Sequence, residues 1–489
     1  MTIQLRRIEE RLRDAGLLRA VQGRLPATID AITDDSRAVR AGTLFVAVRG
    51  SARDGHEFLD AASAAGAAAA IVEDETRTNL PALVVADGRR AAAIAAAAAW
   101  SEPARSLTLA GVTGTNGKTT TVGLLRHLLD GPRGRAASIG TLGILVGSAG
   151  EPLEGGSGLT TPGPIELQRV LRELVDRGVA SVAMEVSSHS LHQRRVEGLE
   201  FAAGVFTNLT RDHLDYHGSM EAYRDAKALL VGQLSRDGAA VVNADDPAWD
   251  ALPRAPRRIT FSASGKDADI RAEGVRFLPR GSEWTLVAFG ERHPVRLPLI
   301  GDFNVANALG AAGAALAMGR TAADIAARLS QAPQVPGRLE LLSEHPAVLR
   351  DYAHTPDALE RALDAVRPFA PERLVVVFGC GGDRDRGKRP VMGRIAAEKA
   401  DVAVVTSDNP RTEDPERILD EIEAGMNGRP HERVEDRRAA IARALDIAGA
   451  NDVVVLAGKG HETYQIRGTT KYPFDEKEIV QELIAERRR

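Results

Sequence analysis

The stretch of sequence that decides the fold reads LTLAGVTGTNGKTTTVGLLRHLL over residues 107–129. Its apolar first part, residues 107–112, predicts a β-strand, and its last part, residues 121–129, predicts a helix. The glycine-rich segment 114–120 lies between them. A strand that runs through such a loop into a helix is typical of a mostly parallel α/β sheet, which binds ligands at the carboxyl ends of its strands.

Four residues of this loop predict phosphate binding. Gly114 and Gly117 let backbone N–H groups wrap an anion, the helix N-terminus adds positive potential, and Lys118 adds a charge. The Thr119 hydroxyl can bind Mg²⁺. Val112 stands where the strict phosphate-loop pattern has glycine, so the match is to a shorter variant. A glycine turn before an ordinary helix is the simpler alternative. Because strand, loop, Lys-Thr pair and helix coincide, we expect ATP as the ligand.

The rest of the chain repeats this α/β rhythm. Apolar runs at residues 182–186, 201–208 and 239–243 predict further strands of the same sheet. We therefore expect an α/β fold of three domains: a small N-terminal α/β domain at 1–105, a central P-loop domain with a doubly wound, mostly parallel sheet at 106–335, and a C-terminal Rossmann-like domain at 336–489.

Composition limits the classes of function. The chain has 489 residues, with 63 Lys+Arg against 67 Asp+Glu and a formal net charge of −4. This balance gives no reason to expect nucleic acid or an anionic membrane as a partner. The longest apolar stretch, residues 91–100, is well below the roughly 20 residues that span a membrane. Cys380 is the single cysteine and cannot form an internal disulfide, so we expect a cytoplasmic protein without membrane insertion.

Polar residues near the predicted strand ends suggest a metal–nucleotide site. Glu185 ends a strand of the sheet that carries the phosphate loop, where a carboxylate can bind Mg²⁺. His213 is a candidate further ligand. For either residue alone, a hydrogen-bonded strand-end side chain is an equal alternative. Lys227 reads from its surroundings as an ordinary exposed helical lysine.

Three apolar runs of the last domain each lead into a glycine-rich or charged loop, at residues 374–378, 402–406 and 452–457. The carboxyl edge of a parallel sheet is where ligands bind. Arg384 and Arg411 follow the first two runs, where a planar guanidinium could grip a carboxylate with two hydrogen bonds. Taken singly, surface arginines in salt bridges are the simpler alternative.

In their order and spacing these motifs resemble the Mur ligases of peptidoglycan precursor synthesis. The resemblance covers all three predicted domains and is strongest for the members that add the third residue of the stem peptide. The matching motifs are Asp35-Ser36-Arg37, residues 114–120, 185–189 and 207–218, Lys227, and residues 351–356, 379–389, 408–411 and 458–462.

The resemblance implies a reaction and its substrate sites. It implies an ATP-dependent ligase that adds meso-2,6-diaminopimelate to UDP-N-acetylmuramoyl-L-alanyl-D-glutamate through an acyl phosphate, in cell wall biogenesis and so in cell shape and division. The implied ATP-binding residues are Gly114, Thr115, Asn116, Gly117, Lys118, Thr119, Thr120, Asn304, Arg338 and Asp351. The implied residues for the uridine nucleotide and its muramoyl dipeptide are Ser36, Ser51, Ala52, Arg53, Thr160, Thr161, Ser187, Gln193 and Arg195.

The resemblance further implies the catalytic and metal-binding residues. The implied catalytic residues are Lys118, Glu185, His213 and Lys227. Two Mg²⁺ ions would be held by Thr119, Glu185, His213 and Lys227, the last as a carbamate. Carboxylation changes the interpretation of Lys227, because a carbamate converts a cation into an oxygen ligand. We expect a monomer.

The amino acid that is added depends on a motif of the last domain. Asp408-Asn409-Pro410-Arg411 resembles the diaminopimelate-adding type, whereas lysine-adding relatives lack the arginine. Diaminopimelate carries a second carboxylate at its far end and lysine does not, so bound lysine would leave Arg411 desolvated and unpaired. The implied diaminopimelate-binding residues are Arg384, Asp408, Asn409, Pro410, Arg411, Gly458 and Glu462.

Several alternatives stay open. Within the family they are a lysine-adding ligase, a murein-tripeptide recycling ligase and a folylpolyglutamate synthase. The Asp35-Ser36-Arg37 element disfavours the last two, and Arg411 disfavours the first. From another class, a P-loop ATPase that drives a binding switch would use the phosphate loop but leave the arginines of the last domain idle. An inactive nucleotide-binding relative is disfavoured because Lys118 and Lys227 are present.

Overall fold

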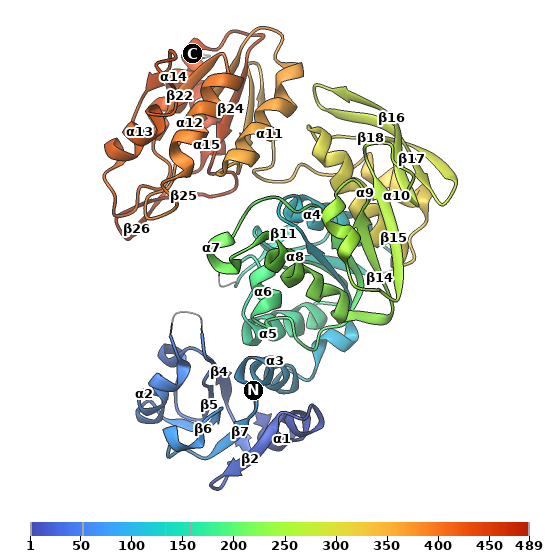
Figure 1. The fold of residues 1–489 in the computed structure, drawn as a ribbon, viewed down its shortest axis with the longest axis vertical. Helices are drawn as coiled ribbons and strands as arrows, with labels where there is room; N and C mark the ends of the chain where they lie inside the picture. Colours follow the sequence, from blue (N-terminus) through green and yellow to red (C-terminus); the bar gives the residue numbers. More distant parts are fainter. Residues whose placement is uncertain (1, 51–52, 133, 156–157, 488–489) are drawn as a thin grey trace. The chain divides into compact units, whose positions relative to one another are not determined.

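The predicted phosphate loop follows β8, a strand of an eleven-stranded sheet (Figure 1). The strand order is β11-β10-β9-β12-β8-β13-β14-β15-β16-β17-β18. All neighbouring pairs from β9 to β16 are parallel, and β10 pairs antiparallel with both β9 and β11. The predicted mostly parallel sheet is confirmed. The strands are β8 (Thr108–Thr113), β9 (Arg135–Gly140), β10 (Gly143–Val146), β11 (Glu151–Leu153), β12 (Val179–Glu185), β13 (Phe201–Phe206), β14 (Leu234–Asn243), β15 (Arg257–Ser262), β16 (Ile270–Leu278), β17 (Gly281–Ala288) and β18 (Glu291–Leu297).

Amphipathic helices cover this sheet. In α5 (Pro164–Asp176), Leu167, Val170, Leu171 and Leu174 recur at helical spacing, are buried, and belong to the same apolar cluster as Met184 of β12. Helix α4 (Lys118–Leu129) follows the loop and packs on β9 and β12. The remaining helices of this region are α6 (Ser188–His192), α7 (Leu214–His217), α8 (Met220–Ala228), α9 (Asp302–Ala317) and α10 (Ala322–Leu329).

The N-terminal part forms a smaller sheet of five strands in the order β2-β7-β6-β5-β4, beside the short pair β1–β3. The alanine-rich tract at residues 91–99 is a packed helix, with Ala91, Ala95 and Ala98 of α3 buried in the core, whereas the alanines at 67–70 belong to a strand. The elements are β1 (Ile3–Gln4), α1 (Leu5–Asp14), β2 (Leu18–Gln22), β3 (Thr28–Ile29), β4 (Ala31–Thr33), β5 (Thr43–Val46), α2 (Leu59–Ala64), β6 (Ala67–Val72), β7 (Ala82–Val85) and α3 (Gly88–Ala99).

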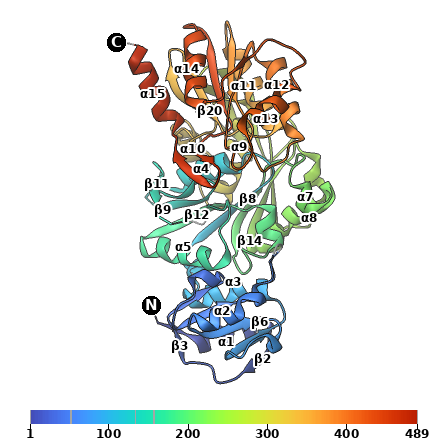
Figure 2. The same ribbon diagram turned by 90° about the vertical axis from the view of Figure 1, so that its left-hand side faces the viewer.

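The C-terminal sheet has six strands in the order β19-β20-β24-β21-β22-β23, and its pairs are parallel except β19–β20. One face packs on α11, α12 and α13, and the other on α14 and α15 (Figure 2). The elements are β19 (Glu340–Glu344), β20 (Ala347–Asp351), α11 (Pro356–Val366), β21 (Leu374–Phe378), α12 (Lys388–Lys399), β22 (Val402–Val405), α13 (Pro415–Glu423), β23 (Glu432–Arg433), α14 (Arg437–Ile447), β24 (Val453–Ala457), β25 (Tyr464–Arg467), β26 (Thr470–Pro473) and α15 (Glu476–Arg487).

The computed structural model describes residues 2–50, 53–132, 134–155 and 158–487. By its internal contacts the chain forms two compact units. The first comprises Met1–Glu273, Leu286–His293 and Ala306–Leu329, and the second comprises Gly274–Thr285, Pro294–Val305 and Ser330–Arg489. The predicted domain boundaries at 105 and 335 stay predictions. Within the described ranges no helix is long and apolar enough to cross a membrane.

A buried ion pair stabilises the C-terminal sheet. Arg437 and Glu476 are 2.8 Å apart with both side chains fully buried, and the Arg437 Nη2 also donates to the carbonyl of Ala457 at 2.9 Å. Removing one member of such a pair leaves an uncompensated charge in the core.

We expect Arg437→Met to lower the free energy of unfolding by about 3 kcal/mol, because Glu476 would stay buried without its cation. Urea unfolding followed by circular dichroism measures the change. Arg438→Met is the matched control, since the neighbouring arginine has a side chain that is 43% exposed. An equal loss of unfolding free energy in the two variants would contradict a stabilising role for the buried Arg437–Glu476 pair.

Candidate active site

The loop between β8 and α4 is shaped for an anion. Gly114 has φ 144° and Gly117 has φ 84°, both in the region that favours glycine. A Cβ on Gly114 would overlap the Thr207 hydroxyl, and one on Gly117 would overlap the Asn307 side-chain oxygen. Because Gly117 turns the chain into the helix, α4 begins at Lys118, three residues before the predicted start. The first N–H groups of α4 therefore face the loop, as an anion site requires.

Hydrogen bonds tie this loop to the segment after β13. The N–H of Thr115 donates to the Asn208 carbonyl at 2.7 Å, and the N–H of Asn116 donates to the Asn208 side chain at 2.9 Å. The Thr207 hydroxyl donates to the Asn116 carbonyl at 2.7 Å. Two of the predicted motifs, 114–120 and 207–218, are thus neighbours in the structure.

Two lysines converge on one carbonyl oxygen in the loop. Lys118 Nζ donates to the Gly114 carbonyl at 2.9 Å and to the Thr115 carbonyl at 2.7 Å, and Lys227 Nζ donates to the same Gly114 carbonyl at 2.7 Å. Lys227 is 1% exposed. Burial, and then the nearby Lys118 charge, hold the pKa of Lys227 well below its usual value. The expectation of an ordinary exposed lysine is therefore wrong.

The sequence did contain a signal for this burial. In α8, Tyr223, Ala226 and Lys227 are all buried, at positions i, i+3 and i+4. That spacing marks the inward face of a helix. The Lys227 ammonium lies 4.4 Å from the centre of the Tyr223 ring. The apolar face of α8 thus indicates a buried lysine, although its chemistry does not follow from the pattern.

Glu185 lies at the carboxyl end of β12, beside Val112 of β8. Its carboxylate is 2% exposed and accepts from the Thr141 N–H at 2.8 Å and from the Thr141 hydroxyl at 3.2 Å. The remaining lone pairs of the two oxygens are available to a cation. This placement fits the predicted metal–nucleotide site on the phosphate-loop sheet.

Residues predicted for the muramoyl dipeptide gather around the same strand end. The Thr161 hydroxyl donates to the Glu185 carbonyl at 2.8 Å and accepts from the Ser187 N–H at 3.2 Å. Arg195 donates to the Thr161 carbonyl at 3.0 Å and to the Gln193 side-chain oxygen at 2.6 Å. The Thr160 hydroxyl lies 3.4 Å from the Thr141 hydroxyl, next to Glu185.

A cluster of rings follows, with His213 4.8 Å from His189 between ring centres. Burial lowers the pKa of His213, and burial together with His213 lowers the pKa of His189 to about 4. Neutral imidazoles of this kind can bind a metal ion. Among the described residues, however, no three His, Cys, Asp or Glu side chains converge on a metal site. The predicted ligand set therefore depends on Thr119 and on a modified Lys227.

The predicted uridine-binding residues lie in the N-terminal sheet region. Ser36 begins a short 3₁₀ helix capped by the Asp35 side chain. Arg53 is exposed, while Ser51 and Ala52 lie outside the described residues. Arg89 donates to the Arg49 carbonyl at 3.1 and 3.0 Å, at the start of this loop. Uridine binding here stays a prediction.

Three residues predicted for the nucleotide belong to the second unit. The Asn304 side chain donates to the Ile300 carbonyl at 2.7 Å. The Asp351 carboxylate accepts from the N–H groups of Leu339 and Ala353, both at 2.8 Å. Burial raises the pKa of Asp351, and Arg338 opposes that rise. Their joint use with the phosphate loop stays a prediction.

The three loops after β21, β22 and β24 meet at one edge of the C-terminal sheet. The Asn409 side chain donates to the Glu462 carboxylate at 2.9 Å, and Arg411 donates to the Gly382 carbonyl at 2.8 Å. A Cβ on Gly381 would lie 2.9 Å from Arg411 Nη1 and 3.8 Å from Arg384 Cγ, so both arginines flank this glycine. Burial raises the pKa of Glu462. The predicted residues Arg384, Asp408, Asn409, Pro410, Arg411, Gly458 and Glu462 therefore form one cluster of cations and carboxylates.

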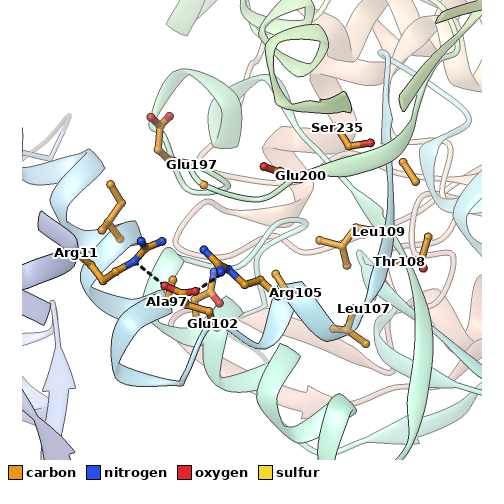
Figure 3. Close-up of a pocket in the computed structure, with 15 residues that line it drawn as sticks. Arg11, Ala97, Glu102, Arg105, Leu107, Thr108, Leu109, Glu197, Glu200 and Ser235 are labelled. Carbon is orange, nitrogen blue, oxygen red and sulfur yellow. Dashed lines mark ion pairs between the residues drawn. The ribbon is translucent and has the colours of Figure 1, made fainter. Parts of the chain in front are cut away.

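A separate cavity of about 610 Å³ lies at the end of the central sheet where β8 begins (Figure 3). Thr108 and Leu109 line it at the amino end of β8, away from the loop at the carboxyl end. Glu102 pairs there with Arg11 and with Arg105, each at 2.6 Å. The cavity holds none of the predicted site residues.

Known proteins provide an independent comparison. Models of three families match, described as "Mur ligase family, catalytic domain" over residues 28–107, "Mur ligase middle domain" over 112–315 and "Mur ligase, glutamate ligase domain" over 337–460. A UDP-N-acetylmuramoyl-L-alanyl-D-glutamate--2,6-diaminopimelate ligase of Gloeobacter violaceus is 48% identical over 468 residues, which cover 94% of each chain. The protein of that name from Geobacillus kaustophilus is 45% identical over 472 residues, covering 94% of this chain and 95% of its own.

Solved structures give the same picture of the fold. A structure of a protein with that name is 33% identical and superposes over 100% of both chains with a TM-score of 0.71. A MurF ligase of Thermotoga maritima in complex with ADP is 21% identical, with a TM-score of 0.65 over 94% of this chain and 98% of that one. At that identity the second likeness concerns the fold alone.

Proposed function

The chain belongs to the Mur ligase family, and from this premise we propose that it adds meso-2,6-diaminopimelate to UDP-N-acetylmuramoyl-L-alanyl-D-glutamate at the expense of ATP. The observation that carries the proposal is the cluster at the edge of the C-terminal sheet. There Arg384 and Arg411 lie beside a glycine loop, and Arg411 acts on the half-buried carboxylate of Glu462. A diamino acid with two carboxylates and two ammonium groups matches this set of charges.

The reaction proceeds in two steps. The γ-carboxylate of the D-glutamyl residue attacks the γ-phosphate of ATP, and an acyl phosphate and ADP form. The amine of diaminopimelate, after losing a proton, attacks the acyl carbon, and inorganic phosphate leaves as the amide forms. In the first step two anions approach each other, so Lys118 and the helix N-terminus at α4 lower the barrier by stabilising the transferring phosphoryl group.

We assign the magnesium site to Thr119, Glu185 and His213, together with Lys227 as a carbamate. The donor chemistry fits: the Glu185 oxygens face donors from Thr141 alone among the described residues, and burial keeps His213 neutral. Bound Mg²⁺, with two ions expected, would neutralise phosphate charge. In this chain Thr119 lies in the first turn of α4 next to Lys118, and Glu185 stays fixed through Thr141.

The surroundings of Lys227 support the proposed carboxylation. Burial, and then the Lys118 charge, hold the pKa of Lys227 well below its usual value, which favours the neutral amine. A neutral amine adds to dissolved CO₂, forming an N–C bond and releasing a proton. The product is a carbamate anion, whose charge is opposite to that of the Lys118 ammonium group.

We therefore expect turnover to fall by at least about tenfold in CO₂-depleted buffer and to recover on addition of bicarbonate. Carbon-13 bicarbonate should give a carbamate signal in the NMR spectrum that Lys227→Met lacks. Lys266→Met is the control, because this exposed lysine donates a hydrogen bond to the Ala244 carbonyl and lies outside the phosphate loop. Full turnover without CO₂, together with no carbamate signal, would contradict the carbamate.

The finer assignments form part of the same proposal. The N-terminal region at 1–105 would bind the uridine nucleotide, the region at 106–335 would bind ATP, and the region at 336–489 would bind the amino acid. The protein would act as a monomer in the cytoplasm, in cell wall biogenesis and thus in cell shape and division. Thr160, Thr161, Ser187, Gln193 and Arg195 support the placement of the muramoyl dipeptide, because they surround Glu185.

Dependence of ADP formation on the other substrates tests the proposal against an ATPase switch. With ATP and Mg²⁺, we expect rapid ADP formation when UDP-N-acetylmuramoyl-L-alanyl-D-glutamate and diaminopimelate are both present. Either substrate alone should give a rate lower by at least about tenfold. An ADP rate that ignores both substrates would favour the switch.

A further inference from the structure

Lys459 has no role in the two reaction steps, although it contacts Asp408, Asn409 and Glu462 of the proposed amino-acid site. Its side chain is fully buried. Its Nζ lies 2.8 Å from the Tyr464 carbonyl, 3.0 Å from Asn409 Oδ1, 3.4 Å from Asp408 Oδ1 and 3.6 Å from Glu462 Oε2. All four atoms are hydrogen-bond acceptors, which favours the ammonium form of this nitrogen. Burial lowers the pKa of Lys459, and the Asp408 carboxylate opposes that fall.

Asn409 links this ammonium group to Glu462. The Ile466 N–H donates to Asn409 Oδ1 at 2.9 Å, which fixes the orientation of the amide, because a backbone N–H can only donate. The same Oδ1 accepts from Lys459, and Asn409 Nδ2 donates to Glu462 Oε2 at 2.9 Å. The chain from Lys459 through Asn409 thus sets the rotamer of Glu462.

Asp408 is the second carboxylate near the Lys459 ammonium group. Its Oδ1 is buried and makes an ion pair with Lys459, yet it accepts no hydrogen bond from any described residue. Gly458 lies beside it, since a Cβ there would be 3.8 Å from the Asp408 carboxyl carbon. Asp408 therefore retains a lone pair for a ligand at the position where the site needs one.

We propose that Lys459 is a positioning residue that holds Asp408 and Glu462 side by side as carboxylates, so that the trio carries one net negative charge and takes the ammonium group at the far end of the diamino acid. This inference rests on the proposed function. Two carboxylates and one ammonium leave a charge of −1, which a single substrate ammonium neutralises. Arg384 and Arg411 then take the neighbouring carboxylate.

Loss of the lysine charge would change how Glu462 titrates. The charged and titratable groups that face Glu462 are Lys459, Asp408, Arg411, Tyr352 and Tyr464. Burial already raises the pKa of Glu462, and Lys459 opposes that rise. Without Lys459 the pKa rises further, so Glu462 gains a proton as the pH falls and loses its attraction for an ammonium group.

Steady-state kinetics of the full chain test the proposal. In Lys459→Met we expect KM for diaminopimelate to rise by roughly 10- to 100-fold, and more at pH 6 than at pH 9. KM for ATP should stay within about twofold. Lys459→Gln, which keeps a donor for Asn409, should show the same loss, because the charge is absent. Lys477→Gln is the control, since the Lys477 side chain is 51% exposed on α15 and lies near Glu340.

A double variant separates charge from scaffolding. Asp408→Asn alone should also raise KM for diaminopimelate, but Lys459→Met with Asp408→Asn restores a net charge of −1. We expect the double variant to recover at least about tenfold of the loss in Lys459→Met. A purely structural lysine would give additive losses and a KM ratio independent of pH, and that result would overturn the proposal.

The outcomes also separate this inference from the proposed function. Wild-type protein without diaminopimelate-dependent turnover would contradict the function itself. Normal wild-type turnover with an unchanged diaminopimelate KM in both Lys459 variants would contradict the positioning by Lys459 alone. Should Lys459→Met fail to fold, as judged by circular dichroism, Lys459→Gln and the double variant decide the question.

Discussion

Lys118→Ala is expected to lower turnover by at least about 10³-fold while the protein stays folded. Its Nζ spans the loop between the carbonyls of Gly114 and Thr115, at the position where backbone N–H groups can cradle a phosphate. A charge there acts on the phosphoryl group as it transfers, so its loss should fall on kcat for acyl-phosphate formation. Single-turnover ADP formation at saturating substrates measures this step directly.

The control for this variant is Lys266→Ala, whose lysine bonds the Ala244 carbonyl and lies outside the loop. Binding of UDP-N-acetylmuramoyl-L-alanyl-D-glutamate should be unchanged in both variants, as calorimetry would measure. Single-turnover ADP formation within tenfold of wild type in Lys118→Ala would contradict the part given to this lysine.

Arg411→Ala is expected to raise KM for diaminopimelate by about 10²-fold, which corresponds to about 2.7 kcal/mol. The Arg411 guanidinium donates to the Gly382 carbonyl at the edge of the C-terminal sheet. A substrate carboxylate bound to this guanidinium would gain charge-assisted hydrogen bonds. KM for ATP should change by less than about twofold, because the arginine lies at the edge of the C-terminal sheet. Steady-state kinetics with each substrate varied in turn gives both values.

Arg467→Ala is the matched control for Arg411. The two residues face each other across an isolated backbone bridge, and the Arg467 side chain is 51% exposed. Arg384→Ala should cause a smaller loss than Arg411→Ala, because Arg384 makes one 3.3 Å hydrogen bond to the Asp383 carbonyl and is exposed. Unchanged use of diaminopimelate in Arg411→Ala would remove this residue from the account of selectivity.

Local sequence patterns predicted the strands whose residues form one continuous apolar run. The run at 107–112 became β8, and the runs at 374–378 and 402–406 became β21 and β22 within one residue. These strands are continuous apolar runs, as expected for strands buried on both faces. Strands β16 to β18 extend the central sheet without a prediction, although β16 and the end of β18 alternate between more buried and more exposed positions, as a half-buried strand does.

The site followed from sequence only where the chemistry is carried by neighbours in the chain. The phosphate loop is such a case, because its glycines, lysine and helix start are consecutive. Lys227 is the opposite case: its low pKa arises from burial on α8 and from Lys118, which lies more than a hundred residues away in the chain. Lys459 is similar, since three of its four acceptors come from the loops after β22 and β24 and the fourth, the Tyr464 carbonyl, begins β25.

The central claim is that this ligase selects diaminopimelate, and one competition measurement tests it directly. The protein is incubated with ATP, Mg²⁺, UDP-N-acetylmuramoyl-L-alanyl-D-glutamate and equal concentrations of meso-diaminopimelate and L-lysine. Mass spectrometry identifies the product, and a phosphate assay counts the turnovers. We predict a UDP-muramoyl tripeptide that carries diaminopimelate, with one phosphate released per product. A lysine-containing tripeptide, or phosphate release without any tripeptide, would contradict the account.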